Sequence, residues 1–147
     1  MIERLNYMAI NAAAIAGMAK AKKDITAIDH RLRAMVELRV SQINGCAYCV
    51  DLHTTEARAA GETQQRLDCL TVWREGPLYT TSEKAALGWA EALTLVSDKG
   101  APDVLFHNLQ AQFTDAEIVD LTLIIAQMNA WNRLAIGFGH QPDIRDN

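Results

Sequence analysis

The sequence predicts an all-α protein with a single domain. Between its glycines and prolines, apolar residues recur at intervals of three and four, which is the period of an α-helix. Alternating runs of valine, isoleucine and threonine, which would indicate β-strands, are missing. The chain has 147 residues, half of them apolar, which suits one domain with one core, so residues 1–147 are interpreted as a single domain.

The helices are expected at about residues 3–22, 26–42, 46–60, 64–74, 80–97, in a short stretch from 102, and at 114–136. The first is interpreted as amphipathic and not as a signal peptide, because Glu3 precedes its apolar centre and lysines follow it. The second carries an apolar stripe that includes Leu32 and Met35. The third lies between Gly45 and Gly61, since glycine interrupts helices.

The later boundaries depend on helix caps. The fourth helix follows Gly61 and has leucines and a tryptophan at helical spacing. Thr80 with Glu83, and Thr114 with Glu117, have the spacing of a capping box, in which each side chain bonds the other residue's backbone N–H. Pro102 is a favoured first residue of a helix. These signals predict where the fifth, sixth and last helices begin.

The last helix is apolar on nearly every side, from Ile118 to Leu134. A helix of this kind is buried, either in the core or against another subunit. Because one fully covered helix is hard to provide in a small chain, this pattern predicts a homo-oligomer. The stretch is not a membrane span, because it is interrupted by Asp120, Gln127 and Arg133.

The net charge of −4 argues against nucleic acid and anionic membranes as partners, since both favour a basic surface. There are three cysteines, which is too few and an odd number for a secreted disulfide scaffold. Without an export signal we expect a cytoplasmic protein. In the cytoplasm, two cysteines close together indicate redox or metal chemistry more often than a structural bridge.

The stretch NGCAYCVDLH, residues 44–53, carries the candidate site. On a helix that starts at Cys46, the helical period brings Cys46, Cys49 and His53 to one inward face. The two thiols lie one turn apart, and Cys49 and His53 are four residues apart, the spacing at which helical side chains meet. Helix-start N–H groups and a neighbouring histidine both favour a reactive thiolate.

Two other interpretations stay open. A zinc site would need two more ligands, for which His53 and Cys69 are candidates, although no second Cys-x-x-Cys pair is present. The cysteines could also be inert core residues. We expect no metal and no cofactor. His30, His107 and His140 are interpreted as surface or structural residues, Cys69 as a core thiol, and the tryptophans as core or interface residues.

The motif and its surroundings resemble a known family. ELRVSQINGCAYCVDLHTTEAR, LTVWREGPLYTTSEKAALGWAEALT and AQMNAWNRLAIGFG are similar to the alkyl hydroperoxidase D-like proteins of the carboxymuconolactone decarboxylase superfamily, over about residues 26–138. The resemblance implies an all-helical fold, assembly as trimers or hexamers, and a dithiol centre that reduces peroxides without metal or flavin. Decarboxylases of the superfamily lack the cysteine pair.

The resemblance also implies roles for single residues. Cys49 would be the peroxidatic thiol, Cys46 the resolving thiol, and His53 with a glutamate of the preceding helix the proton relay. The family's glutamate, twelve residues before the first cysteine, falls at Ala34 here. Glu37, one turn along and within about 60° on the same helix, is expected to take its place, the alternative being a solvated surface glutamate.

The expected function is that of a thiol peroxidase. Peroxide would oxidise Cys49 to a sulfenic acid, Cys46 would form the disulfide, and an external dithiol or thiol protein would reduce it. At the helix start, Cys46 is expected to be an exposed thiol within easy reach of that reductant. The alternatives are a redox adaptor that passes electrons to a separate peroxidase, and a lyase of the same superfamily.

Overall fold

The computed structural model describes residues 3–145. Its helices are α1 Tyr7–Ile10, α2 Ala12–Asp24, α3 His30–Asn44, α4 Ala47–Ala59, α5 Gln64–Asp68, the 3₁₀ turn η1 Leu70–Val72, α6 Thr81–Thr94, α7 Val96–Lys99, α8 Asp103–Gln110 and α9 Asp115–Phe138. Residues 3–145 contain no β-strand, so the all-α prediction is confirmed.

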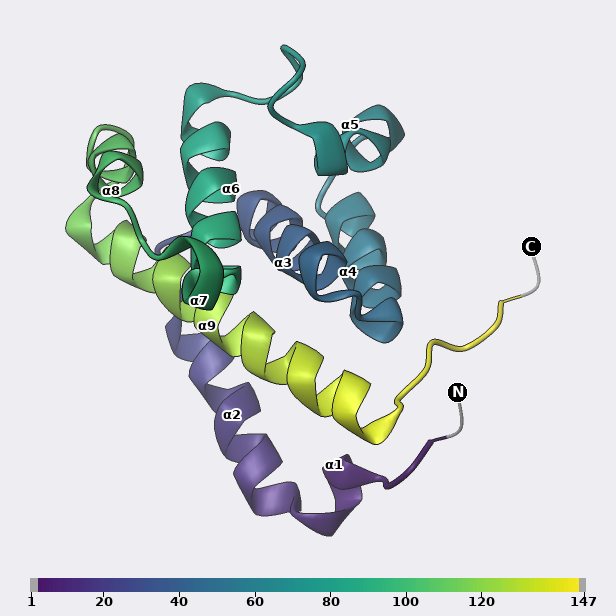
Figure 1. Cartoon of the computed structure of the whole chain (residues 1–147). Coiled ribbons are helices and arrows are strands. Elements are labelled where there is room, and N and C mark those ends of the chain that lie inside the picture. The colour runs from purple at the N-terminus through teal and green to yellow at the C-terminus, as the bar shows by residue number, and fades with distance from the viewer. Residues whose placement is uncertain (1–2, 146–147) are drawn as a thin grey trace.

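Helix α3 lies at the centre of the molecule, enclosed by α4, α6 and α9 (Figure 1). All side chains from Leu32 to Leu38 are buried, so α3 contacts other elements on every side. Helix α8 covers the outer sides of α6 and α9. The core between these helices is filled mainly by leucine, isoleucine and methionine, including Met35, Leu121 and Ile124. The central position of α3 matters for the site, because α4 with its cysteine motif packs directly against it.

The start of the chain differs from the expected single amphipathic helix. It forms two helices, α1 and α2, which are separated at Asn11. The side chain of Asn6 accepts the backbone N–H of Ala9, and that of Asn11 accepts the N–H of Ala14, so each asparagine starts a new helix. No residue of α2 is fully buried, but Ile15, Met18 and Lys22 are half-buried along one face, so the helix packs through an amphipathic stripe that is only partly covered within one chain.

Helix α3 begins at His30 and not near residue 26 as expected. Asp29 caps it by accepting the N–H groups of Arg31 and Leu32, both at 3.0 Å. The preceding residues are held outside the helix because Asp120 of α9 accepts their backbone N–H groups, at 3.0 Å from Thr26 and 2.8 Å from Ala27. This contact ties the chain before α3 to the far side of the core.

The later helices begin where the capping boxes predicted, but several of them are broken or shorter than expected. Both capping boxes are present, at Thr80–Glu83 and Thr114–Glu117. The fourth predicted helix, 64–74, is instead α5 followed by η1, with Cys69 between them. The fifth, expected to reach 97, is broken at Leu95 into α6 and α7. Pro102 is the N-cap of α8 and not its first helical residue.

A buried polar network joins α3 to α9 beside the cysteine motif. Asn132 is fully buried, and its Nδ2 donates to Ser41 Oγ at 3.2 Å. Ser41 Oγ in turn donates to the carbonyl of Glu37 at 2.7 Å. Asn44 Nδ2 donates to the side-chain oxygens of Asn132 and Asn129, at 2.9 and 3.0 Å. The asparagines of α9 therefore anchor the end of α3 within the chain, and the turn to α4 starts from a rigid position.

Helix α9 is not covered on all sides within one chain, which leaves cover by another subunit as the predicted arrangement. Val119, Leu123 and Ile136 are 58, 45 and 41% exposed, and Phe106 of α8 lies beside the first two at the same surface hollow, 39% exposed. An exposed apolar patch of this kind is costly in water. It supports the predicted association.

We therefore expect light scattering on the purified protein to report at least a trimer. Replacing Val119 and Leu123 together with glutamate should shift the protein to smaller species, because two charges would have to be buried at the interface. A monomer at micromolar concentration in the unsubstituted protein would contradict this prediction.

Candidate active site

The two cysteines lie at the turn between α3 and α4. Gly45 ends α3 with φ 69° and ψ 34°, a left-handed conformation that favours glycine. Cys46 is the N-cap of α4, and its backbone N–H donates to the carbonyl of Ser41 at 3.1 Å. Its Sγ accepts the backbone N–H of Cys49 at 3.3 Å. The first sulfur thus lies at the N-terminal end of α4, where N–H groups and the helix dipole stabilise a thiolate.

Cys46 and Cys49 form a disulfide, with their Cα atoms 5.3 Å apart. The expected convergence on one inward face agrees with the structure, in which Cys46, Cys49 and His53 are 1, 3 and 4% exposed. The expectation of an exposed Cys46 thiol is wrong. The turn at Gly45 directs this side chain back under the first turn of α4 and into the core, so the start of a helix is not an open position here.

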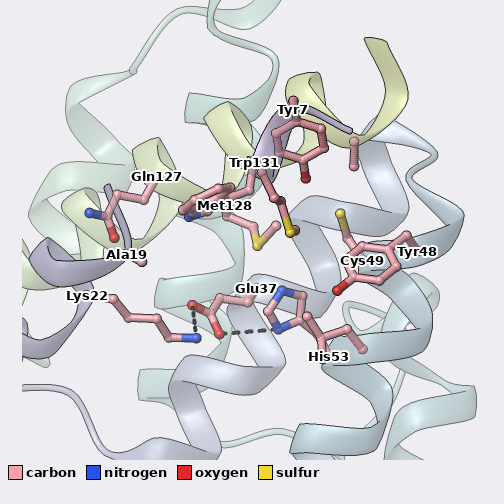
Figure 2. Close-up of a pocket in the computed structure, with 13 residues that line it drawn as sticks. Tyr7, Ala19, Lys22, Glu37, Tyr48, Cys49, His53, Gln127, Met128 and Trp131 are labelled. Carbon is pink, nitrogen blue, oxygen red and sulfur yellow. Dashed lines mark ion pairs between the residues drawn. The ribbon is translucent and has the colours of Figure 1, made fainter. Parts of the chain in front are cut away.

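His53 lies one turn beyond Cys49 and faces two carboxylates. Its Nδ1 is 2.8 Å from Oε2 of Glu56. The same nitrogen is 3.4 Å from Oε2 of Glu37, a contact that Figure 2 marks with a dashed line. Glu37 projects from α3 and is 5% exposed, so the alternative of a solvated surface glutamate does not apply. The structure therefore brings together all four residues that the sequence singled out: Cys46, Cys49, His53 and Glu37.

Two cationic side chains form ion pairs with the Glu37 carboxylate. Arg33, one turn earlier on α3, donates from Nε to Oε1 at 3.2 Å. Lys22, at the end of α2, reaches the same oxygen at 3.5 Å (Figure 2). Arg33 is also buried, and its Nη1 donates to the carbonyls of Lys22 and Ile25. The buried charge of Glu37 is thereby neutralised, as burial of a carboxylate requires.

Glu56 was not expected at the site from the sequence, although it lies three residues after His53 on the same helix. The hydrogen bond with His53 is the main cause that lowers the pKa of the Glu56 carboxyl. An ionised carboxylate can only accept a hydrogen bond, so Nδ1 of His53 carries the proton. In the neutral ring, Nε2 is then free to accept a proton, and Figure 2 shows that nitrogen on the side of the pocket.

A pocket of about 200 Å³ gives access to Cys49 and His53. Its wall is mostly apolar and includes Leu52, Met128 and Trp131, with Tyr48 beside Cys49 (Figure 2). Cys46 does not line this pocket. A molecule that enters it therefore meets the second cysteine of the motif and not the first.

The N-terminal helices complete the pocket. Tyr7 and Met8 of α1 and Lys22 of α2 lie on its wall, outside the stretch of about 26–138 in which the sequence placed the motif-bearing core. Burial, with a contribution from Tyr48, raises the pKa of Tyr7, so its hydroxyl stays protonated as a donor. That hydroxyl points into the pocket (Figure 2). No local sequence pattern links these residues to the cysteine motif.

The sequence model of the carboxymuconolactone decarboxylase family matches residues 9–92, more than half of the chain. The chain belongs to the carboxymuconolactone decarboxylase family. Uncharacterised protein YdfG of Bacillus subtilis, which is 45% identical over 116 residues, matches over 79% of both chains.

Two solved structures share the fold of this family member. One is a protein of unknown function from Agrobacterium tumefaciens, provisionally described as the antioxidant defence protein AhpD. It is 40% identical, has a TM-score of 0.94, and the match covers 98% of this chain and 100% of that one. The other is the debrominase Bmp8, at 21% identity, a TM-score of 0.79, and 90 and 70% coverage, a likeness that concerns the fold alone. The resemblance to alkyl hydroperoxidase D-like proteins is thus confirmed.

The other histidines, Trp131 and Cys69 of this carboxymuconolactone decarboxylase family member lie outside the cysteine motif. His140 packs edge-on against Tyr48, with ring centroids 4.2 Å apart, whereas His30 and His107 are exposed. Trp131 lines the pocket, which the sequence did not predict. Cys69 is a free, partly buried thiol. Within residues 3–145, none of the helices has the length and apolar character needed to cross a membrane.

Among residues 3–145, the side chains that could hold a metal ion are Glu37, His53 and Glu56, whose ligand atoms lie within 4.8 Å of one another. This set differs from the cysteine set considered from the sequence. A divalent cation here would face the positive charges of Lys22 and Arg33, which already accompany Glu37. We therefore expect elemental analysis of protein purified without chelator to find well under one zinc per chain. Stoichiometric zinc that is lost in Glu56→Gln would identify this cluster as a metal site.

Proposed function

We propose that this protein is a thiol-dependent peroxidase with a two-cysteine cycle. The observation that carries the proposal is the position of Cys49, which lies on the wall of a mostly apolar pocket with His53 one turn away and Cys46 within disulfide distance. A thiolate, a base and a second thiol are the groups that such a cycle needs. The peroxide-reducing dithiol centre implied by the family resemblance agrees with this geometry.

In the first step, the Cys49 thiolate attacks the outer oxygen of a hydroperoxide. The O–O bond breaks, Cys49 becomes a sulfenic acid, and the released alkoxide takes a proton and leaves as the alcohol. Before this step, Nε2 of His53 accepts the thiol proton, and the carboxylates at Nδ1 stabilise the resulting imidazolium. The same proton is then available to the leaving alkoxide.

In the second step, the Cys46 sulfur attacks the Cys49 sulfenic acid. The S–S bond forms and the hydroxyl group leaves as water, with the thiol proton of Cys46. An external dithiol supplies the two electrons that restore both thiols. The N-cap position favours Cys46 for this role, because its sulfur accepts the N–H of Cys49 and lies at the positive end of α4, which helps the thiol to lose its proton as it attacks.

The wall of the pocket favours an organic hydroperoxide over hydrogen peroxide. Tyr48, Met128 and Trp131 provide apolar contact for a carbon chain or ring, which a molecule without carbon cannot use. The polar groups in the pocket are few, among them the Tyr7 hydroxyl and the side chains of Lys22 and Gln127.

Stopped-flow oxidation of the reduced protein tests the proposal. Hydrogen peroxide and cumene hydroperoxide are mixed separately with reduced protein, and the loss of thiols is followed together with the tryptophan fluorescence, to which Trp131 on the pocket wall contributes. We expect two thiols to be lost per peroxide, with cumene hydroperoxide reacting faster. Oxidation no faster than that of free cysteine, combined with rapid disulfide exchange, would favour the redox adaptor. If neither peroxide oxidation nor disulfide exchange is fast, the lyase is the alternative that is left.

A further inference from the structure

We infer that the reducing thiol enters through the same pocket as the peroxide and attacks the Cys49 sulfur, with Cys46 as the leaving thiolate. This inference rests on the proposed function for its place in a cycle, although the disulfide exchange itself is independent of peroxide. It assigns the position of attack and limits the reductant to a slender thiol of low molecular weight.

Access is the first reason. Cys49 lies on the pocket wall, whereas Cys46 is 1% exposed, is absent from that wall and belongs to the core cluster. Attack on a disulfide depends on which sulfur an incoming thiolate can reach. Cys49 is itself only 3% exposed, so an attacking thiol has to enter the pocket to reach its sulfur. A small thiol can reach Cys49 through the pocket of about 200 Å³ that the proposed peroxide would use.

The second reason is the leaving group. Exchange is faster when the departing thiol has a low pKa. Cys46 Sγ accepts the backbone N–H of Cys49 and lies at the N-terminus of α4, a helix of 13 residues. Both features stabilise its thiolate. Cys49 lacks the N-cap position and depends on His53 for its thiolate, whereas Cys46 is stabilised by the helix start itself and leaves directly as a thiolate.

The chemistry balances over two exchanges. The donor thiolate forms a bond to Cys49 Sγ while the Cys46–Cys49 bond breaks, which leaves a mixed disulfide on Cys49 and a thiolate on Cys46. The donor's second thiolate then attacks the donor sulfur of that mixed disulfide, so that the donor leaves as its disulfide and Cys49 as a thiolate. The donor loses two electrons, and the protein gains them with two protons.

The decisive experiment maps the adduct without peroxide. Oxidised protein is mixed with excess 2-mercaptoethanol, quenched in acid at short times and alkylated with N-ethylmaleimide. The tryptic peptide 40–58 holds both cysteines between the cleavage sites Arg39 and Arg58. We expect the peptide with 2-mercaptoethanol on Cys49 and the maleimide on Cys46 to be at least tenfold more abundant than the peptide with the reverse modification. An adduct mainly on Cys46, or equal amounts, overturns the inference.

If Cys46 displaces 2-mercaptoethanol from Cys49 before the quench, single-cysteine variants show which sulfur is attacked. With glutathione disulfide, Cys46→Ser should form a mixed disulfide on Cys49 at least tenfold faster than Cys49→Ser forms one on Cys46. Equal rates, or a faster Cys46, contradict the assignment.

A pocket variant tests the shared entrance. Leu52→Trp narrows the pocket and should slow reduction by 2-mercaptoethanol at least tenfold, whereas Val72→Trp, at an exposed site on η1, should leave it unchanged. Equal rates in both variants exclude entry by this route. None of these experiments contains peroxide. If the protein passes them but consumes no peroxide, the proposed peroxidase function is disproved and the inferred route of disulfide exchange still holds.

Discussion

Replacing Cys49 with serine is expected to abolish peroxide consumption, because the sulfur on the pocket wall would be lost and Cys46 is buried outside the pocket. Cys46→Ser should behave differently and react once, since Cys49 and His53 remain but no thiol can close the disulfide. In that variant, a sulfenic-acid trap should label Cys49, which is then over-oxidised by further peroxide.

Mass spectrometry after one equivalent of peroxide distinguishes the two variants. Cys69→Ser is the matched control, because Cys69 is a free thiol that does not line the pocket, and its loss should change little. A sulfenic acid on Cys46 in Cys49→Ser would reverse the two roles. Unchanged kinetics in both variants would end the redox hypothesis.

The second large effect is expected at His53. His53→Ala removes the only base within helical reach of Cys49 on α4, so peroxide consumption should fall by ~10²–10⁴-fold at neutral pH. Because a thiol without a base ionises near ~8.5, the residual rate should rise toward alkaline pH, and its midpoint should lie above that of the unsubstituted protein. The measurement is the pH profile of the initial oxidation rate.

The two carboxylates at His53 should have separable effects. Glu56 is the nearer of them, at 2.8 Å against 3.4 Å for Glu37, and is not held by Arg33. Glu56→Gln keeps a hydrogen-bond acceptor but removes the charge, and we expect a loss on the order of 10-fold, as for other groups that orient a histidine. Glu37→Gln should cost stability as well as rate, because it leaves Arg33 buried without its counter-charge.

The pH dependence of Glu56 has a definite sign. Its pKa is lowered on folding, chiefly by the hydrogen bond with His53. The pair therefore stabilises the fold above the ordinary carboxyl pKa of 4.5, and this contribution is lost as the pH falls through the lower folded value. Between about pH 6 and 9 the carboxylate stays ionised. If Glu56→Gln shifts the midpoint of the rate profile within that range, the shift reports on the thiol and His53. Glu75→Gln, which changes an exposed glutamate, is the control and should leave the midpoint unchanged.

Several features of this protein follow from short stretches of sequence. The helical period alone predicts an all-α chain, and it brings Cys49 and His53 to one face because residues on a helix meet through local geometry. The capping boxes at Thr80 and Thr114 were also found where they were predicted, since each depends only on a residue three positions away.

Tertiary structure decided which residues surround the motif. Glu37 reaches His53 because α3 packs against α4, and Tyr7 reaches the pocket because the N-terminal segment is bound to the end of α9, where the Arg4 N–H donates to the carbonyl of Phe138. The burial of Cys46 likewise depends on the core beneath the turn at Gly45. The sequence by itself determined the helical class and the order of reactive groups along one helix, because those depend on neighbours a few residues apart. Distances between helices arise from packing among residues far apart in the chain, and only the folded structure decides those.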